Sequence, residues 1–137
     1  MARHKNAFAM LTISGPLTAS AGRPVPLHLK FANISADKRM MIVESCQWSN
    51  PVWDVRDRAG NKLLYSPMIQ TDCNKTPIDL GPSMWQEWSV DPSFSFRFPK
   101  TGTYFFTATF TYKLEDPRTK IETLQTVTSN TILVNIR

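Results

Sequence analysis

Hydrophobic and polar residues alternate along most of this chain, as they do in strands with one buried face. The clearest run covers residues 102–112, where aromatic residues and alanine share one face and threonines dominate the other. Residues 25–31 and 52–57 alternate in the same way. We find no long stretch with the 3.6-residue spacing of an amphipathic helix. The pattern therefore predicts an all-β protein.

Turn residues divide the rest of the chain into further short strands. We expect these strands at residues 8–13, 39–43, 62–65, 83–90 and 126–136. Arg58-Ala-Gly-Asn61 separates two of the runs and predicts a β-hairpin of residues 52–57 with 62–65. Pro24 and Pro26 flank the start of another strand, which is typical of an edge strand or of a first strand residue.

Seven to nine short antiparallel strands, with turn signals between them, predict an immunoglobulin-like β-sandwich. At 137 residues the chain has the length of a single domain. We therefore expect one domain over residues 1–137, with residues 1–7 as a flexible N-terminal tail. Residues 66–82 contain three prolines and are predicted to form a loop.

Cys46 and Cys73 are the only cysteines, and both lie beside strand-like runs with Trp48 near the first. We expect them to form a disulfide, which favours a periplasmic or secreted location. The alternative is two buried free thiols that pack as small apolar residues. Asn33-Ile-Ser35 and Asn74-Lys-Thr76 fit the glycosylation sequon, a pattern that also arises often by chance.

The N-terminal residues and the charge distribution bear on where the protein is located and on which partners it binds. The apolar run after the basic start Met1-Ala-Arg-His-Lys5 is too short for a signal peptide, so export implies a leader removed from this sequence. No run is long enough to span a membrane as a helix. The net charge is +5, but the basic residues are scattered and form no stripe, so we expect no nucleic-acid partner.

Residues that could carry catalysis or bind a metal are sparse. His4 and His28 are the only histidines, and no metal-ligand spacing surrounds them. There is no nucleophile elbow of the Gly-x-Ser-x-Gly type. Asp54 and Glu87 lie on separate predicted strands, where solvated charges are the expected interpretation. The sequence predicts that the protein is not an enzyme and needs no cofactor or metal.

The tryptophans are the residues most typical of a binding surface, because an indole offers a large rigid contact area with one donor. Trp85 and Trp88 are three positions apart, so on a strand they point to opposite faces. We expect Trp53 and one of this later pair in the core. The candidate binding residues are Trp48, Trp88 and Trp85.

Several motifs resemble those of exported bacterial immunoglobulin-like single domains, including, more loosely, the BsuPI-type proteinase inhibitors. They are Gly22-Arg-Pro-Val-Pro-Leu with Phe31-Ala-Asn33, then Asp57-Arg-Ala-Gly-Asn61, then Gly102-Thr-Tyr-Phe-Phe. Cys46-Gln-Trp-Ser, Asp72-Cys-Asn-Lys and Thr128-Ser-Asn-Thr are similar to segments of uncharacterised exported bacterial proteins. The resemblance implies the fold and export, and it carries no catalytic residue.

Taken together, these features favour a non-catalytic binding or assembly module of the bacterial cell envelope with a protein partner. Open sandwich edges can bind such a partner by strand addition. One alternative is a proteinase-inhibitor-like protein that uses the loop at 66–82. Another is a carbohydrate-binding module that uses exposed tryptophans. The sequence does not fix the oligomeric state.

Overall fold

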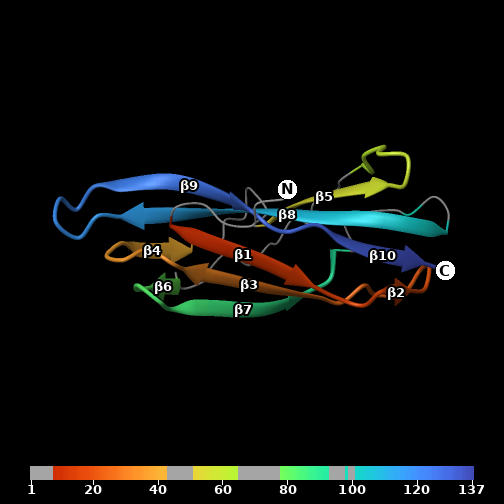
Figure 1. Cartoon of the computed structure of the whole chain (residues 1–137), viewed down its shortest axis with the longest axis horizontal. Helices are drawn as coiled ribbons and strands as arrows, with labels where there is room; N and C mark the ends of the chain where they lie inside the picture. Colours follow the sequence, from red (N-terminus) through yellow and green to blue (C-terminus); the bar gives the residue numbers. More distant parts are fainter. Residues whose placement is uncertain (1–7, 43–50, 65–77, 93–97, 99–100) are drawn as a thin grey trace, which may run out of the picture.

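The structure, a computed structural model, describes residues 8–42, 51–64, 78–92, 98 and 101–137. Its named elements are all β-strands (Figure 1). They are β1 (Ala9–Ser14), β2 (Thr18–Ala19), β3 (Leu27–Asn33), β4 (Arg39–Ile42), β5 (Val52–Asp57), β6 (Ile78–Leu80), β7 (Trp85–Val90), β8 (Gly102–Glu115), β9 (Glu122–Thr128) and β10 (Ile132–Ile136). Within these residues no helix has the length and hydrophobicity to cross a membrane.

The strands form a small sheet and a larger one. The small sheet has the antiparallel order β1-β3-β7. The larger sheet is built on β8, which has β9 and β10 along one edge and β4 and β5 along the other. β6 extends it beyond β4, and the short β2 pairs in parallel with β10. Figure 1 shows β8 running through most of the length of the molecule.

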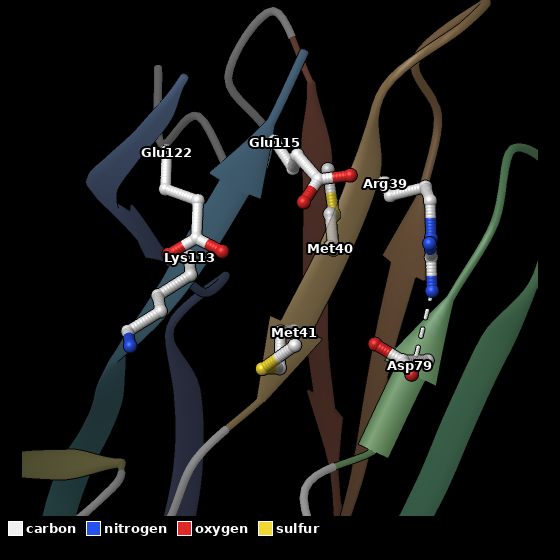
Figure 2. Close-up of a pocket in the computed structure, with 7 residues that line it drawn as sticks. All are labelled: Arg39, Met40, Met41, Asp79, Lys113, Glu115 and Glu122. Atoms are coloured by element: carbon white, nitrogen blue, oxygen red, sulfur yellow. Dashed lines mark ion pairs between the residues drawn. The ribbon is translucent and has the colours of Figure 1, made fainter. Parts of the chain in front are cut away.

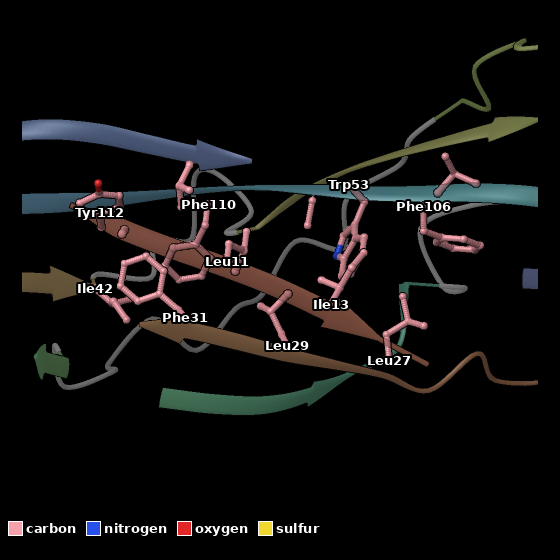
Figure 3. Packing of buried hydrophobic residues seen from close by; sticks show 14 of the residues in the cluster. Leu11, Ile13, Leu27, Leu29, Phe31, Ile42, Trp53, Phe106, Phe110 and Tyr112 are labelled. Carbon is pink, nitrogen blue, oxygen red and sulfur yellow. The ribbon is translucent and has the colours of Figure 1, made fainter. Parts of the chain in front are cut away.

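The two sheets share one hydrophobic core, which the alternation along β8 creates. Every second residue of this strand from Tyr104 to Tyr112 is buried, as the sequence predicts. Phe31 of the small sheet packs on them, with ring centroids 4.9 Å from Phe110 and 5.2 Å from Tyr112 (Figure 3). Full burial of one such side chain stabilises the fold by roughly 1.5–3 kcal/mol. Trp53 also lies in this core, as expected, with 6% of its surface exposed.

The predicted final strand at residues 126–136 is in fact two strands, because Ser129 and Asn130 leave the ladder between β9 and β10. The backbone N–H of Ser129 donates to the Ala108 carbonyl, and its hydroxyl accepts the Ala108 N–H at 2.8 Å. The Asn130 side chain accepts the Ile13 N–H at 2.8 Å and donates to the Ile13 carbonyl at 2.9 Å. This amide thus occupies the outer edge of β1 and ties the two sheets together.

Pro26 directly precedes β3, in agreement with the predicted position of Pro24 and Pro26 at the start of a strand, whereas the edge-strand alternative is wrong because β3 lies between β1 and β7. Two further local predictions differ from the structure. In the described residues, the hairpin of residues 52–57 with 62–65 is limited to one bridge from Arg56 to Lys62 and two neighbouring hydrogen bonds, from the Asp57 N–H to the Asn61 carbonyl and from the Leu63 N–H to the Val55 carbonyl. Part of the predicted loop at 66–82 is the strand β6, whose three residues are too few to show an alternating pattern.

Asn33 at the end of β3 is a second polar link between the sheets. Only 1% of its surface is exposed. Its amide donates to the carbonyls of Lys38 at 2.9 Å and of Leu80 at 3.0 Å, and its oxygen accepts the N–H and hydroxyl of Ser35. The nitrogen that glycosylation would modify is therefore buried and bonded, which excludes the sequon at Asn33 in the folded protein.

We predict that Asn33→Ala lowers the free energy of unfolding by about 2–4 kcal/mol, because it leaves buried carbonyls without donors. Urea denaturation followed by tryptophan fluorescence measures the change. Asn135→Ala is the matched control, since Asn135 is exposed on β10 and should cost less than about 0.5 kcal/mol. Equal effects of the two substitutions would contradict the structural role given to Asn33.

Candidate functional site

The small sheet ends at β7, which a tight turn brings in beside β3. Met84 donates its N–H to the Gly81 carbonyl at 3.1 Å, with Pro82 in the second turn position. Ser83, in the third, has a φ of 68°, as a type II turn requires. Asn33 donates to the Met84 carbonyl and accepts the Ser83 N–H, so two residues oppose one in a β-bulge. Regular pairing starts at Trp85.

The hydrogen bonds of β3 show which backbone groups of β7 point away from the sheet. Asn33 donates to the Met84 carbonyl, whereas Ile34 donates to Phe8 in β1. Since opposed residues in antiparallel pairs alternate between bonded and non-bonded, the bonded partners of β3 are Gln86, Trp88 and Val90. The N–H and C=O groups of Trp85, Glu87 and Ser89 then point outward, and no backbone bond among the described residues occupies them.

The outer face of this edge carries exposed apolar side chains at one end. Trp85 is 57% exposed, and Ile34, which follows β3, is 44% exposed. Met84, directly before Trp85, is 50% exposed, and its sulfur accepts the Gly81 N–H at the turn. We call these three residues the Trp85 patch. The ammonium nitrogen of Lys30 lies 5.1 Å from the centre of a Trp85 ring, a cation–π contact that orients the indole on the sheet surface.

The inner face of β7 lies at the border of the core. Trp88 is half-buried and stacks on Phe110, with ring centroids 5.6 Å apart. Gln86 and Val90, on the same face, are also half-buried. β7 therefore shows partly accessible side chains on its inner face and an exposed tryptophan on its outer face.

A small group of charges lies on the outer face beside the Trp85 patch. The His28 Nε2 atom is 3.7 Å from a Glu87 carboxylate oxygen. Lys30 lies directly opposite Glu87 in the β3–β7 register. Glu87 is thus flanked by basic side chains of its own sheet, as expected for a solvated surface charge. Asp54 is also a paired surface charge, since its carboxylate lies 3.0 Å from the Arg56 side chain on β5.

The candidate residues from the sequence separate into three groups. Cys46, Cys73 and Trp48 lie outside the described residues, so their pairing and exposure stay predictions. Trp85 and Trp88 lie on opposite faces of β7, as their spacing indicates, with Trp88 on the core side and Trp85 on the solvent side. The sequence did not single out the unpaired backbone edge of β7, because strand order is set by contacts distant in sequence.

A hollow lies on the outer face of the larger sheet. Arg39, Met40, Met41, Asp79, Lys113, Glu115 and Glu122 line it (Figure 2). Arg39 and Asp79 form an ion pair at 3.4 Å, and Glu115 lies opposite Glu122 in the β8–β9 ladder. The described residues include no group of three or more His, Cys, Asp or Glu side chains that could hold a metal. The hollow is a charged surface with its own ion pair, and we assign it no site.

Asp116, in the loop between β8 and β9, organises the end of the sandwich. The Arg118 N–H at 2.9 Å and the Lys38 ammonium at 3.1 Å hold the pKa of the Asp116 carboxyl below its ordinary value of 3.8. Lys38 belongs to the loop between β3 and β4, so this ion pair joins two loops at the same end of the molecule.

No protein-family model matches the sequence, and no curated protein is significantly similar to it. Among solved structures, the chain resembles native alpha-2-macroglobulin from Escherichia coli, from domain MG7 to the C-terminus, with a TM-score of 0.52 and 13% identity. This match covers 98% of the chain but only 17% of that structure.

Two further solved structures are similar at lower scores. The CARDB domain of a Pyrococcus furiosus protein, in complex with di-metal ions, has a TM-score of 0.45 and 14% identity, covering 95% of this chain and 90% of that one. AggA, the major subunit of aggregative adherence fimbriae type I from E. coli, has a TM-score of 0.40 and 15% identity, covering 99% and 100%. The fold comparison confirms the predicted immunoglobulin-like β-sandwich.

We predict that the two tryptophans of β7 differ in their contribution to stability. Trp88→Ala should lower the free energy of unfolding by about 2–3 kcal/mol, because it removes packing against Phe110 and leaves a cavity. Trp85→Ala should cost less than about 1 kcal/mol, the typical energy of an exposed cation–π contact. Urea denaturation measures both, and an equal loss in Trp85→Ala would show that Trp85 is a packing residue.

We also predict a pH-dependent contribution from Asp116. Because its pKa is lowered in the folded state, its contribution is present above the ordinary pKa of 3.8 and disappears as the pH falls through the lower, folded value. Asp116→Asn should therefore reduce stability at neutral pH but not under strongly acidic conditions. Urea denaturation across this range tests it, with Asp79→Asn as the control for removing an exposed paired carboxylate. A pH-independent difference would contradict the prediction.

Proposed function

We propose that this chain is a non-catalytic binding or assembly module of the bacterial cell envelope, and that it binds another polypeptide through the edge of β7. The observation that carries the proposal is a six-residue edge strand with outward backbone groups at Trp85, Glu87 and Ser89 and with the Trp85 patch beside them. An added strand would gain main-chain hydrogen bonds at these three residues and specificity from its alternating side chains.

The other strand edges in the described part of the chain support this choice. The Asn130 side chain occupies the edge of β1 at Ile13. Leu63 donates its N–H to Val55 along the outer edge of β5. β9 also has an outer edge, with Leu124 exposed and Val127 buried, but its other core-side residues Thr123 and Gln125 are polar and at least partly exposed. β2 and β6, at the ends of the larger sheet, have only two and three residues. β7 combines an available edge with an aromatic side chain on each face.

The chemistry of the β7 edge indicates what a bound strand must contain. On the outer face its side chains would lie beside the Trp85 patch and Glu87, so an apolar residue and an uncharged or basic one fit there. On the inner face a side chain would cover the accessible part of Trp88. Desolvated aromatic anchors of this kind contribute most of the binding energy in typical interfaces.

Envelope location and a single-domain organisation belong to the same proposal. They are supported by the predicted Cys46–Cys73 disulfide and by the resemblance to exported single domains. A carbohydrate-binding module is the second candidate, and the exposed indole of Trp85 favours it over the inhibitor-like alternative. Affinity electrophoresis in polysaccharide gels tests it, because retardation lost in Trp85→Ala and kept in Leu133→Ala would favour carbohydrate over protein.

Site-specific photocrosslinking in the bacterium that produces the protein tests the protein-binding function. A benzoylphenylalanine at position 87 should yield an adduct with a polypeptide, whereas one at Leu133, exposed on the opposite sheet, should not. Ser89→Pro should abolish the adduct, because proline removes the outward N–H at an edge position.

Ser89→Ala is the matched control, since it keeps the N–H and should keep the adduct. Adducts of equal yield at positions 87 and 133, or an adduct that persists in Ser89→Pro, would contradict binding at the β7 edge.

A further inference from the structure

We infer that the polypeptide bound at β7 is a second copy of this chain, whose own β7 pairs antiparallel with the first in a register centred on Trp88. The inference rests on the proposed function, because it uses the same edge. It adds the identity of the occupant, the two-fold symmetry and the register, all of which follow from the residues of β7.

The positions of the outward backbone groups restrict the registers that two β7 strands can adopt. In each hydrogen-bonded pair between the two copies, both residues must be Trp85, Glu87 or Ser89, because these residues have outward backbone groups. A two-fold axis can then pass beside any residue from Trp85 to Ser89. Axes at Trp85, Gln86 or Ser89 pair at most half of the strand, whereas axes at Glu87 or Trp88 pair nearly all of it.

Charge decides between the two long registers. An axis at Glu87 places the two Glu87 carboxylates directly opposite each other, which destabilises a cross-strand pair. An axis at Trp88 places each Glu87 opposite Ser89 of the second copy, which carries no charge. Each Glu87 also keeps its own His28 at 3.7 Å. The register centred on Trp88 is therefore the long one without opposed like charges.

The inner face favours the same register. The two Trp88 residues become a non-hydrogen-bonded pair, in which side chains approach most closely. Each indole already stacks on Phe110 at 5.6 Å, so the second indole would cover the part that stays accessible in the monomer. Gln86 lies opposite Val90 of the second copy and covers its apolar side chain. The junction would thus extend the aromatic cluster from one core into the other.

The expected dimer is weak, because two single strands bury far less surface than a standard interface of about 1,600 Å². The net charge of +5 also repels the second copy, and salt screens this repulsion. We therefore expect a concentration-dependent monomer–dimer equilibrium that shifts toward the dimer when the salt concentration rises.

Sedimentation velocity over a wide concentration range tests the association on the purified full chain. The wild type and Ser89→Ala should show a rise in the weight-average sedimentation coefficient with concentration, and Ser89→Pro should stay monomeric. The Ser89 N–H points away from β3, so Ser89→Pro should keep the near-ultraviolet circular dichroism of the fold. A dimer that persists in Ser89→Pro, or a wild type that is monomeric throughout, would overturn the inference.

Cysteine crosslinking tests the register, even if Ser89→Pro fails to fold. Non-bonded pairs have Cα atoms about 4.5 Å apart, a separation that a disulfide can bridge. A mixture of Gln86→Cys and Val90→Cys, which both keep Glu87, should form a heterodimer through these two positions, identified by peptide mass spectrometry. A mixture of Trp85→Cys and Ser89→Cys should not link through positions 85 and 89. A disulfide between positions 85 and 89 would place the axis at Glu87 and overturn the proposed register.

The two proposals fail in different ways. If the photocrosslink at position 87 joins a different polypeptide and the purified chain stays monomeric, the edge binds but the occupant is not a second copy. If no adduct forms at position 87 and no dimer forms, the proposed function fails as well.

Discussion

Burial of one face of β8 is the constraint on which the rest of the structure depends. A strand of fourteen residues with an aromatic face must be covered along its length and paired on both edges. Four shorter strands supply the pairing, and the small sheet supplies the cover through Phe31 and its neighbours. Because that sheet has three strands in the described part of the chain, it ends there beside the core at β7. The half-buried Trp88 follows directly from this limited cover.

Two asparagines, the buried Asn33 and the half-buried Asn130, hold the small sheet in register with the larger one. Asn130 provides a donor and an acceptor to Ile13, as a further strand residue would, and Asn33 links β3 to Leu80 of β6. A buried amide stabilises a structure only where all its groups are bonded, so each fixes one relative position of the sheets. These asparagines belong to the sequence motifs Phe31-Ala-Asn33 and Thr128-Ser-Asn-Thr131, which gives both motifs a structural explanation.

The sequence predicted what depends on local alternation and missed what depends on distant pairing. The strands at residues 102–112 and 52–57 and the burial of Trp53 follow from period-two patterns. The break between β9 and β10, the central place of β3 and the short β6 do not, because hydrogen bonds to residues far along the chain decide them. The spacing of Trp85 and Trp88 indicated opposite faces. Only the register with β3 showed that their strand is an edge.

An open edge beside exposed aromatic residues is a liability for a monomer, since it invites pairing with any extended chain. Among the described residues, Asn130 occupies the edge of β1 at Ile13, and Lys62 and Leu63 lie along that of β5, whereas β7 carries no proline or bulge along its paired length. Its one inserted residue, at Ser83, precedes the strand and leaves Trp85–Val90 regular. The bulge therefore determines where β7 starts, but it does not protect the edge of the strand. A strand that pairs with another chain requires such an unprotected edge.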